Sequence, residues 1–563
     1  MNKDNNKNLL LATTLSVIVM ISWAWFYEKP RMEKISLQNS LQEKSANNPS
    51  TSNMQASSPN PSPSTTATKI TEEEKTPISL KNRQEIIKEE DGQRIKISSN
   101  SLHGSINLKG AKFDDLTLAK YFVKIDQKEE VVLFSPAQSK ERYFVDFGFA
   151  SSNSNLDLPK NDTIWQANST TLTPQNPVTL SWTNSQNVEF KIKISLDENY
   201  LFTISQSVKN NSPQSIAIAN YGRINRSILN LNKSAYILHE GLIGAFNGIL
   251  NETTYEKILE ENNQKFTDNG GSGSWLGITD KYWLSSIIPD KKISFEANFS
   301  HQLKNQNHLY NVDFIGQELV VNQGEEINIE QHLFAGAKKV KILDSYNKEL
   351  NLKLFDRAID FGWFYFLTKP FFFVIEFLYK IFGNFGLAIL GMTVIVKLAL
   401  FPMANKSYEA IAKMKKLQPQ MQKIRENFKD DKMALNREMM ELYKKEKINP
   451  ASGCLPIIIQ IPVFFALYKV FYVTLDMRHA EFFGWIRDLS APDPTTILNL
   501  FGILPFEVST SFTLGIWPIL MGATMIIQQR LSPPPADPTQ AKILKYMPYG
   551  LTIVLATFPA GLV

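Results

Sequence analysis

Residues 384–403, NFGLAILGMTVIVKLALFPM, decide how the rest of the chain is arranged. About 20 apolar or small residues in a row are enough to cross ~30 Å of hydrocarbon as a helix. Thr393 and Lys397 interrupt this run. A lysine inside a membrane span costs about 2.5–3.5 kcal/mol, so we expect Lys397 to face protein or water and to have a function. The alternative is that its long stem carries the ammonium to the nearby headgroups.

A basic segment, residues 404–449, follows this predicted span of residues 383–403. Apolar residues recur in it at helical spacing on both sides of a polar break at 429–431, so we expect a hairpin of two amphipathic helices. Its density of lysines places it in the cytoplasm. Most of these charges are expected to be solvated, and the hairpin is expected to act as one docking unit. The candidate docking residues are Lys413, Lys415, Lys416, Asp430 and Asp431.

The next apolar segment, 452–475, contains Pro456, Gln460 and Pro462. Two prolines in one span free backbone carbonyls that neighbouring helices or water must satisfy. We therefore expect a slightly broken helix beside a polar cavity. Cys454 is the one cysteine of the chain, so no intrachain disulfide can form, and it is expected to be a small buried apolar residue.

Two more apolar segments, 511–529 and 546–563, are expected to span the membrane. The acidic stretch before them, with Phe482, Phe483 and Trp485, is typical of an interfacial hairpin outside the cell membrane. On the other side of the first span, residues 346–382 are predicted to form an amphipathic helix on the outer leaflet, bent at Pro370.

Residues 88–345 have a different character, with short alternating strands separated by Asn, Gly, Pro and Ser. This pattern predicts an all-β sandwich. The aromatic patch 275–290 is expected to belong to the core rather than to a partner contact. The strand-like segments are RIKISSN, GSINLKG, VVLFSP, RYFVDFGF, PVTLSWT, VEFKIKISL, LFTISQSV, SIAIANYG, ISFEANFS, LYNVDFI and INIEQHLF. Five histidines of this region have no metal-ligand spacing, and structural roles are expected for them: His103, His239, His301, His308 and His332.

The first 87 residues connect this domain to the membrane. Residues 1–30 combine lysines, an apolar run and a terminal aromatic cluster, which favours an uncleaved transmembrane anchor. A cleavable signal peptide is the alternative. Residues 31–87 are rich in Asn, Ser, Pro and Thr and are expected to be a disordered linker.

Three motifs in this order, KMKKLQP, MMELYKKEKINPASGCLPIIIQIPVFFALYKV and FFGWIRDLSAPDP, resemble the YidC family of membrane protein insertases of Gram-negative bacteria. The resemblance covers residues 331–563 and implies that the exported domain is a periplasmic β-supersandwich similar to sugar-binding and mutarotase folds. The family usually has arginine where this chain has Lys397, so the charge is kept but the guanidinium fork is lost. In the family FPAGLV opens one more span, followed by a basic tail, so the chain is expected to be truncated before its last span.

The expected fold is therefore a membrane α-helical bundle with an all-β periplasmic supersandwich domain and a cytoplasmic helical hairpin. We expect a non-enzymatic insertase of the bacterial inner membrane, without metal or cofactor, whose hydrophilic groove attracts acidic or polar stretches of a nascent chain. Burial of apolar residues in lipid would drive the transfer. The candidate groove residues are Lys397, Thr393 and Gln460. The candidate hydrophobic slide consists of Pro456, Ile457, Ile461, Phe465, Phe558 and Pro559.

The expected partners are nascent membrane proteins and the lipid bilayer, with a ribosome or targeting receptor at the hairpin; the resemblance adds the Sec translocon. A formal net charge of +5 is modest for 563 residues, so no specific nucleic-acid binding is expected. Two alternatives belong to other classes. One is an ion- or proton-coupled transporter that uses Lys397. The other is an exported carbohydrate-active enzyme, against which the lack of a defensible carboxylate pair argues.

Overall fold

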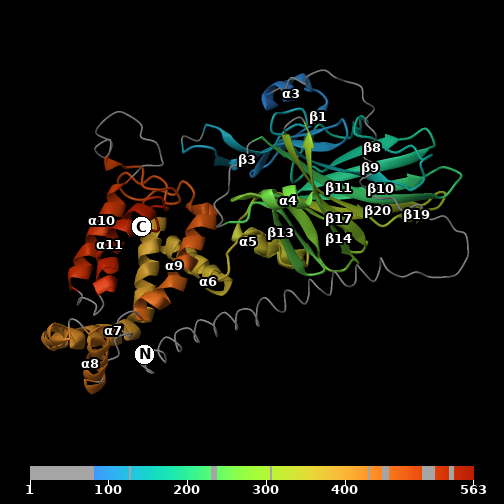
Figure 1. Ribbon diagram of the computed structural model, residues 1–563. Helices are drawn as coiled ribbons and strands as arrows, with labels where there is room; N and C mark the ends of the chain where they lie inside the picture. Colours follow the sequence, from blue (N-terminus) through green and yellow to red (C-terminus); the bar gives the residue numbers. More distant parts are fainter. Residues whose placement is uncertain are drawn as a thin grey trace, which may run out of the picture. The chain divides into compact units, whose positions relative to one another are not determined.

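The computed structural model describes most of the chain after residue 81 (Figure 1). The predicted anchor at 1–30, most of the predicted linker and Cys454 lie outside the described residues. The contacts divide the chain into two units, one containing residues 408–453 and the other the β domain and the remaining helices, and each is described by itself. The described ranges are 82–125, 128–229, 238–304, 307–428, 431–446, 455–497, 514–531 and 538–563.

The β domain contains an 11-stranded sheet that is mostly antiparallel. Its order is β14-β17-β18-β11-β5-β3-β2-β1-β7, with β19 paired to β11 and β4 paired to β3. The strands are β1 (Arg94–Ser98), β2 (Leu102–Asn107), β3 (Lys112–Phe122), β4 (Glu130–Phe134), β5 (Tyr143–Ala150), β7 (Thr171–Leu172), β11 (Ile216–Ile228), β14 (Asn263–Asp268), β17 (Phe295–Lys304), β18 (Asn307–Gly316) and β19 (Leu319–Val321).

A second, nine-stranded sheet has the order β13-β12-β15-β16-β20-β10-β9-β8-β6. β20 is the last strand of the domain in the sequence, yet it lies in the interior of this sheet between β16 and β10. The strands are β6 (Gln166–Ala167), β8 (Val178–Thr183), β9 (Val188–Leu196), β10 (Leu201–Asn210), β12 (Gly241–Phe246), β13 (Ile249–Thr254), β15 (Trp275–Thr279), β16 (Trp283–Ile288) and β20 (Glu326–Ala337).

The inner faces of the two sheets pack on each other and form the core. Phe113 of the first sheet meets Phe202 of the second with ring centroids 5.3 Å apart, and Phe149 meets Phe190 at 5.1 Å. Every second residue of β9 is buried, as expected for strands with one face in a sandwich. Trp275, at the start of the aromatic patch, is fully buried. The predicted all-β sandwich is confirmed.

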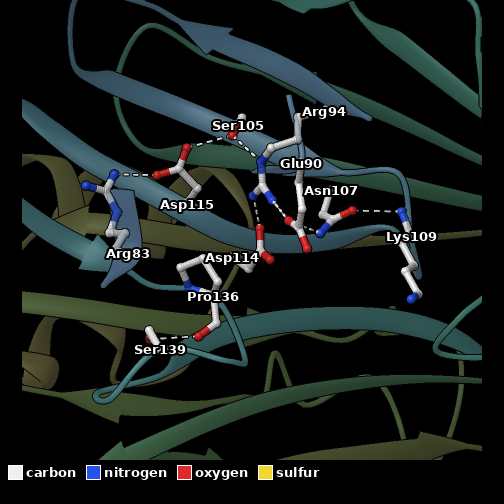
Figure 2. A network of polar contacts seen from close by, with 10 residues as sticks. All are labelled: Arg83, Glu90, Arg94, Ser105, Asn107, Lys109, Asp114, Asp115, Pro136 and Ser139. Carbon is white, nitrogen blue, oxygen red and sulfur yellow. Dashed lines mark hydrogen bonds and ion pairs between the residues drawn. The ribbon is translucent and has the colours of Figure 1, made fainter. Parts of the chain in front are cut away.

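A short helix, α3 (Arg83–Glu89), precedes the first strand and is fixed to the first sheet by ion pairs (Figure 2). Arg83 pairs with Asp115, and Arg94, at the start of β1, pairs with Asp114. Both carboxylates lie on β3 and are almost fully buried. Burial raises the pKa of the Asp114 carboxyl to about 6, although the nearby Arg94 guanidinium acts in the opposite direction. Charged side chains are thus accommodated inside the domain by direct pairing.

The helical part follows the β domain in the chain. Of the described helices, only α7 is long and apolar enough to cross a membrane by length and composition, and residues 458–473 form a shorter apolar helix. The helices are α4 (Tyr255–Glu261, within the β domain), α5 (Val340–Glu349), η2 (Phe355–Ala358), α6 (Tyr365–Phe382), α7 (Phe385–Asn427), α8 (Lys432–Lys445), α9 (Leu455–Val473), η4 (Leu475–Met477), α10 (Ile516–Leu531) and α11 (Pro538–Leu555).

Residues 346–382 do not form one amphipathic helix, which differs from the expectation. Leu354 has a left-handed backbone with φ of 58°, and the next long helix begins only at Tyr365. Packing on the β domain is the physical reason. Phe355 is fully buried with its ring 5.1 Å from that of Trp275, whose indole N–H donates to the Lys353 carbonyl at 2.8 Å. Tertiary contacts therefore override the helical spacing of these residues.

Two helix boundaries also differ from the predicted spans. α7 continues without interruption past Met403 to Asn427, so the first span and the first arm of the hairpin are one helix. α11 ends at Leu555, whereas the predicted span runs to residue 563. Pro559 and Gly561 favour an early end, and the chain turns there with the Ala560 N–H donating to the Ala491 carbonyl at 2.8 Å.

Candidate functional site

Lys397 lies on the exposed side of α7, together with Thr393 one turn earlier. The opposite side of the helix is packed, since Ala388 and Met392 are 0% and 2% exposed. The Thr393 hydroxyl donates to the Ile389 carbonyl at 3.0 Å. Lys397 makes no ion pair with another described residue, so its ammonium is available to a polar group that approaches this face of the helix.

α9 carries the second set of predicted site residues. Ile461 and Phe465 lie one turn apart and are 48% and 51% exposed, so they form an apolar stripe on one side of the helix. Gln460 is half-buried and lies about 100° around the helix from Ile461. Pro456 and Ile457 belong to α9, but their side chains lie outside the described set.

Phe558 and Pro559 belong to the segment after α11 and pack more closely than a free slide surface would. Pro559 is buried, and Phe558 is half-buried with its ring centroid 5.3 Å from that of Tyr468 on α9. These two residues therefore join the segment after α11 to α9, while Ile461 and Phe465 remain open.

The predicted site residues fall into two patches rather than one closed pocket. No hydrogen bond or ion pair joins Lys397 to Gln460. α6 is close to both of their helices: it packs against α9, and a Cβ at Gly391 of α7 would lie 3.2 Å from the Phe382 ring of α6. The structure thus brings Thr393 and Lys397 together on one helix, and Ile461 and Phe465 together on another.

A lysine that was not predicted as a site residue fixes the C-terminal end of α9 to the segment between η2 and α6. The Lys469 ammonium lies 2.8 Å from the Asp360 carboxylate, and the two side chains are 16% and 23% exposed. The same carboxyl group accepts the backbone N–H groups of His239 at 3.2 Å and Gly362 at 2.9 Å. The signal in the sequence was a second lysine in an apolar helix, but its partner lies 109 residues away.

Three further contacts lie at the end of α9 and in the residues that follow it. The Lys281 ammonium lies 3.7 Å from the centre of the Tyr472 ring, and the Arg478 guanidinium donates to the Val123 carbonyl at 3.3 Å. An ion pair of 3.3 Å joins Lys339 to Asp476. Burial in this junction lowers the pKa of Lys281 to about 8. Contacts on four positions between residues 469 and 478 therefore hold this end of α9 in place.

Asp493 organises the start of α10 and was also missed. Its side chain is buried and accepts the Thr495 N–H at 3.0 Å through one oxygen and the Trp517 N–H at 3.0 Å through the other. A carboxylate at this position satisfies free N–H groups in the first turn and complements the helix dipole. α10 then pairs with α11, where Gly522 leaves room for the Thr552 side chain.

The basic hairpin has a small core of its own in the unit that contains residues 408–446. Leu417 and Met421 of α7 pack with Met439 and Tyr443 of α8, and all four are buried. The Asp431 carboxylate caps α8 by accepting the N–H groups of Met433 and Ala434 at 2.9 and 3.0 Å. Two helices pack here as predicted, with α7 ending at Asn427 and α8 beginning at Lys432; residues 429–430 of the predicted polar break lie outside the described residues.

The predicted docking residues of the hairpin are mostly solvated. Lys413 pairs with Glu409 at 3.1 Å, one turn apart on the same helix, and Lys415 and Lys416 are exposed. Asp430 lies outside the described residues, and Asp431 serves as the helix cap. The lysines therefore remain available to a partner, whereas Asp431 has a structural role.

The histidines of the β domain are dispersed, except for one pair. His301 on β17 and His308 on β18 approach to 3.0 Å between their ring nitrogens and stack on each other. His332 contacts the Thr203 hydroxyl at 3.1 Å, and His103 pairs with Glu130. In the part of the chain that the structure describes, no group of three or more His, Cys, Asp or Glu residues is placed to hold a metal ion.

Two family models together match most of this chain. Residues 94–374 match the model described as the YidC periplasmic domain, and residues 377–563 match the model described as the 60Kd inner membrane protein.

Curated relatives match over almost the whole length. The chain is 47% identical over 561 residues to a membrane protein insertase YidC of Rickettsia bellii, covering 99% of this chain and 96% of that protein. It is 46% identical over 562 residues to the protein of the same name from Rickettsia canadensis, with the same coverage. A solved structure titled as an active YidC insertase with its first transmembrane domain resolved is 16% identical, covers 84% of this chain and 89% of its own, and has a TM-score of 0.34.

Proposed function

The chain belongs to the YidC family of membrane protein insertases and is a non-enzymatic insertase of the inner membrane with its β domain in the periplasm; from this premise we propose that the exposed face of α7 around Lys397 receives the polar part of a nascent membrane protein. The observation that carries this proposal is the ammonium of Lys397. It is the one charged group between residues 384 and 405, and it is exposed without an ion pair to another described residue.

The physical need for such a group follows from the cost of moving polar groups into hydrocarbon. A short polar terminus or loop that crosses unassisted leaves its polar groups without partners, at several kcal/mol each. A cation on the exposed face of a membrane helix attracts acidic and polar segments and shortens the distance over which they are unpaired. We propose that Thr393, on the same face, and Gln460, on the neighbouring patch of α9, add hydrogen-bonding capacity along the path of the substrate.

The apolar part of the substrate would follow a separate path. Ile461 and Phe465 present an exposed stripe on α9, and we propose that the hydrophobic segment of the substrate moves along this stripe into lipid. No covalent step is needed, because the burial of about 20 apolar residues at roughly 25 cal/mol per Å² supplies the driving force. Pro456, Ile457, Phe558 and Pro559 complete the proposed slide, the last two as packed support rather than as an open surface.

The charge of Lys397 can be tested by comparing Lys397→Ala with Lys397→Arg. Two single-span substrates that differ only in an acidic or a neutral periplasmic tail would be inserted into vesicles containing each variant. We expect Lys397→Ala to slow insertion of the acidic-tailed substrate several-fold, and Lys397→Arg to retain it. The neutral-tailed substrate serves as the control for folding of the insertase. Unchanged insertion of the acidic-tailed substrate by Lys397→Ala would refute the proposal.

The slide can be tested by site-specific photo-crosslinking during synthesis of a small membrane protein. Crosslinkers at Ile461 and Phe465 should capture the apolar segment of the substrate. Ile553 on α11 is 68% exposed and lies outside the proposed slide, so a crosslinker there is the matched control. Equal capture at all three positions would show that the substrate has no preferred path along α9.

The hairpin is proposed to dock a ribosome or targeting receptor, and the Sec translocon is proposed as a working partner. The support is chemical: Lys413, Lys415 and Lys416 are exposed on a helix that has its own packed core. Replacing the three lysines with glutamine should weaken ribosome binding and its dependence on salt while leaving the buried core of the hairpin intact. Copurification of Sec subunits with the wild-type chain, compared with a hairpin deletion, tests the second partner.

A further inference from the structure

A hollow of about 330 Å³ lies between α5, α6, the first residue of α7 and η4. Its walls are largely apolar, and its rim combines three lysines with two carboxylates. The wall residues are Val340, Phe372, Tyr379 and Phe385, and the rim residues are Lys339, Lys341, Lys380, Glu376 and Asp476. Neither the Lys397 face of α7 nor the apolar stripe on α9 contributes a residue to this hollow.

The position of the hollow is set by two apolar helices. Phe385 is the first residue of α7, and its ring stacks on that of Tyr379 with centroids 3.8 Å apart. Asp476 follows the end of α9 at Val473 by three residues. The hollow therefore lies where α7 and α9 reach the outer boundary of the hydrocarbon, which is the level of the phospholipid headgroups. Exposed Trp485, in the segment that follows η4, is typical of the same level.

The charges on the rim do not cancel. Glu376 pairs with Lys341 and lies 4.0 Å from Lys380, so one carboxylate is shared by two ammonium groups. Lys339 pairs with Asp476. Three lysines against two carboxylates leave one positive charge. The Lys341 and Lys380 side chains are 55% and 64% exposed, whereas Glu376 is 22% exposed, so the cations are the outward-facing groups.

We propose that this hollow binds a phospholipid of the outer leaflet, with the phosphate at Lys341 and Lys380 and the glycerol and upper acyl chain against the ring of Tyr379, which is 36% exposed. A phosphodiester carries one negative charge and neutralises the excess on the rim. The apolar wall distinguishes a lipid from a free anion, because inorganic phosphate gains nothing from contact with the Tyr379 ring. Ammonium groups are common phosphate ligands, and their stems pack on apolar surface.

Retention of phospholipid by the full chain tests the proposal. The purified protein in detergent would be titrated with a phosphatidylethanolamine and phosphatidylglycerol mixture, and bound lipid counted by native mass spectrometry. We expect Lys341→Gln with Lys380→Gln to retain several-fold less lipid. Lys257→Gln with Lys265→Gln is the control pair, because both lysines are exposed on the β domain and Lys257 also pairs with a glutamate.

A variant with the opposite expected sign separates lipid binding from misfolding. Glu376→Gln keeps the lysines and removes the carboxylate that competes with phosphate, so it should retain more lipid than the wild type. Equal retention in the wild type, the lysine variant and Glu376→Gln would overturn the proposal. If millimolar inorganic phosphate displaced the lipid, the site would recognise only a phosphate group, and the proposal that it binds a lipid would be wrong. Persistence of the lipid under that condition supports it.

Discussion

The β domain buries its large apolar side chains, whereas the helical part leaves many of them exposed. In the β domain Trp275 and Phe299 are fully buried between two sheets. In the helical part Leu398 and Ile553 are 67% and 68% exposed. The sandwich removes its apolar surface from water by itself, whereas the helices leave theirs for lipid to cover. The difference shows that the stability of the first region is internal, while that of the second depends on the bilayer.

The same contrast holds for charge. In the β domain the buried carboxylates Asp114 and Asp115 each have an arginine partner (Figure 2). On α7 the ammonium of Lys397 has no ion-pair partner among the described residues. A folded domain pairs its interior charges to remain stable. A charge left unpaired on a membrane helix is instead suited to a transient partner.

The largest expected effect comes from shortening one leucine in each region. Leu284→Ala on β16 opens a cavity at a fully buried position and should lower the free energy of unfolding of the β domain by about 2–5 kcal/mol. Leu398→Ala removes the same atoms from an exposed position on α7 and should change stability by less than about 0.5 kcal/mol. Pulse proteolysis of the full chain in detergent measures both. Similar losses of unfolding free energy in the two variants would show that the two regions do not differ in how they bury apolar side chains.

A second test measures how the buried carboxyl of Asp114 makes the stability of the β domain depend on pH. Burial raises its pKa from 3.8 to about 6, so between these values the folded domain binds a proton that the unfolded chain has released. The wild type should therefore gain stability relative to Asp114→Asn as the pH falls from about 6 to 4, by at most ~1.4 kcal/mol per pH unit. Below 4 the gain levels off, and above 6 it is absent. Parallel unfolding curves for the two proteins across this window would contradict the assignment.

The smallest expected effect is at the junction between the two regions. Lys469→Ala removes a partly buried ion pair with Asp360 and should cost about 1–2 kcal/mol locally. Hydrogen exchange at the Gly362 N–H, which donates to the same carboxyl group, should accelerate about tenfold. Lys469→Arg keeps the charge and should retain most of the protection. Unchanged exchange in Lys469→Ala would show that this end of α9 is held by its other contacts.

Periodicity predicted much of this fold from the sequence. The alternation in β9 and β10 and the long apolar run around Lys397 each indicate one kind of element, and both are present. β3 escaped prediction because KFDDLTLAKYF has two adjacent carboxylates, Asp114 and Asp115, as the third and fourth residues of the strand. Those carboxylates are compatible with a buried strand only because Arg83 and Arg94 reach them, and no local pattern reports such a pairing.

The candidate site was predictable to the level of single helix faces. Thr393 and Lys397 share a face because they are four residues apart, which the sequence alone determines. The Lys469–Asp360 pair could not be predicted, since it joins segments 109 residues apart. Periodicity indicates which face of a helix or strand is buried, but it does not identify the distant residue with which a side chain pairs.

The place of β20 has a consequence for the order in which the domain can form. β10 and β16 both pair with β20, and β20 is the last strand of the domain to leave the ribosome. Until residue 337 has been exported, two hydrogen-bonding edges of the nine-stranded sheet stay open. Closing the β10 edge requires contacts across more than 100 residues, whereas the β16 edge pairs with residues 44 to 54 positions later in the chain. The domain is thus exposed to mispairing from the synthesis of β10 until that of β20, and a periplasmic chaperone that shields unpaired edges would act in this interval.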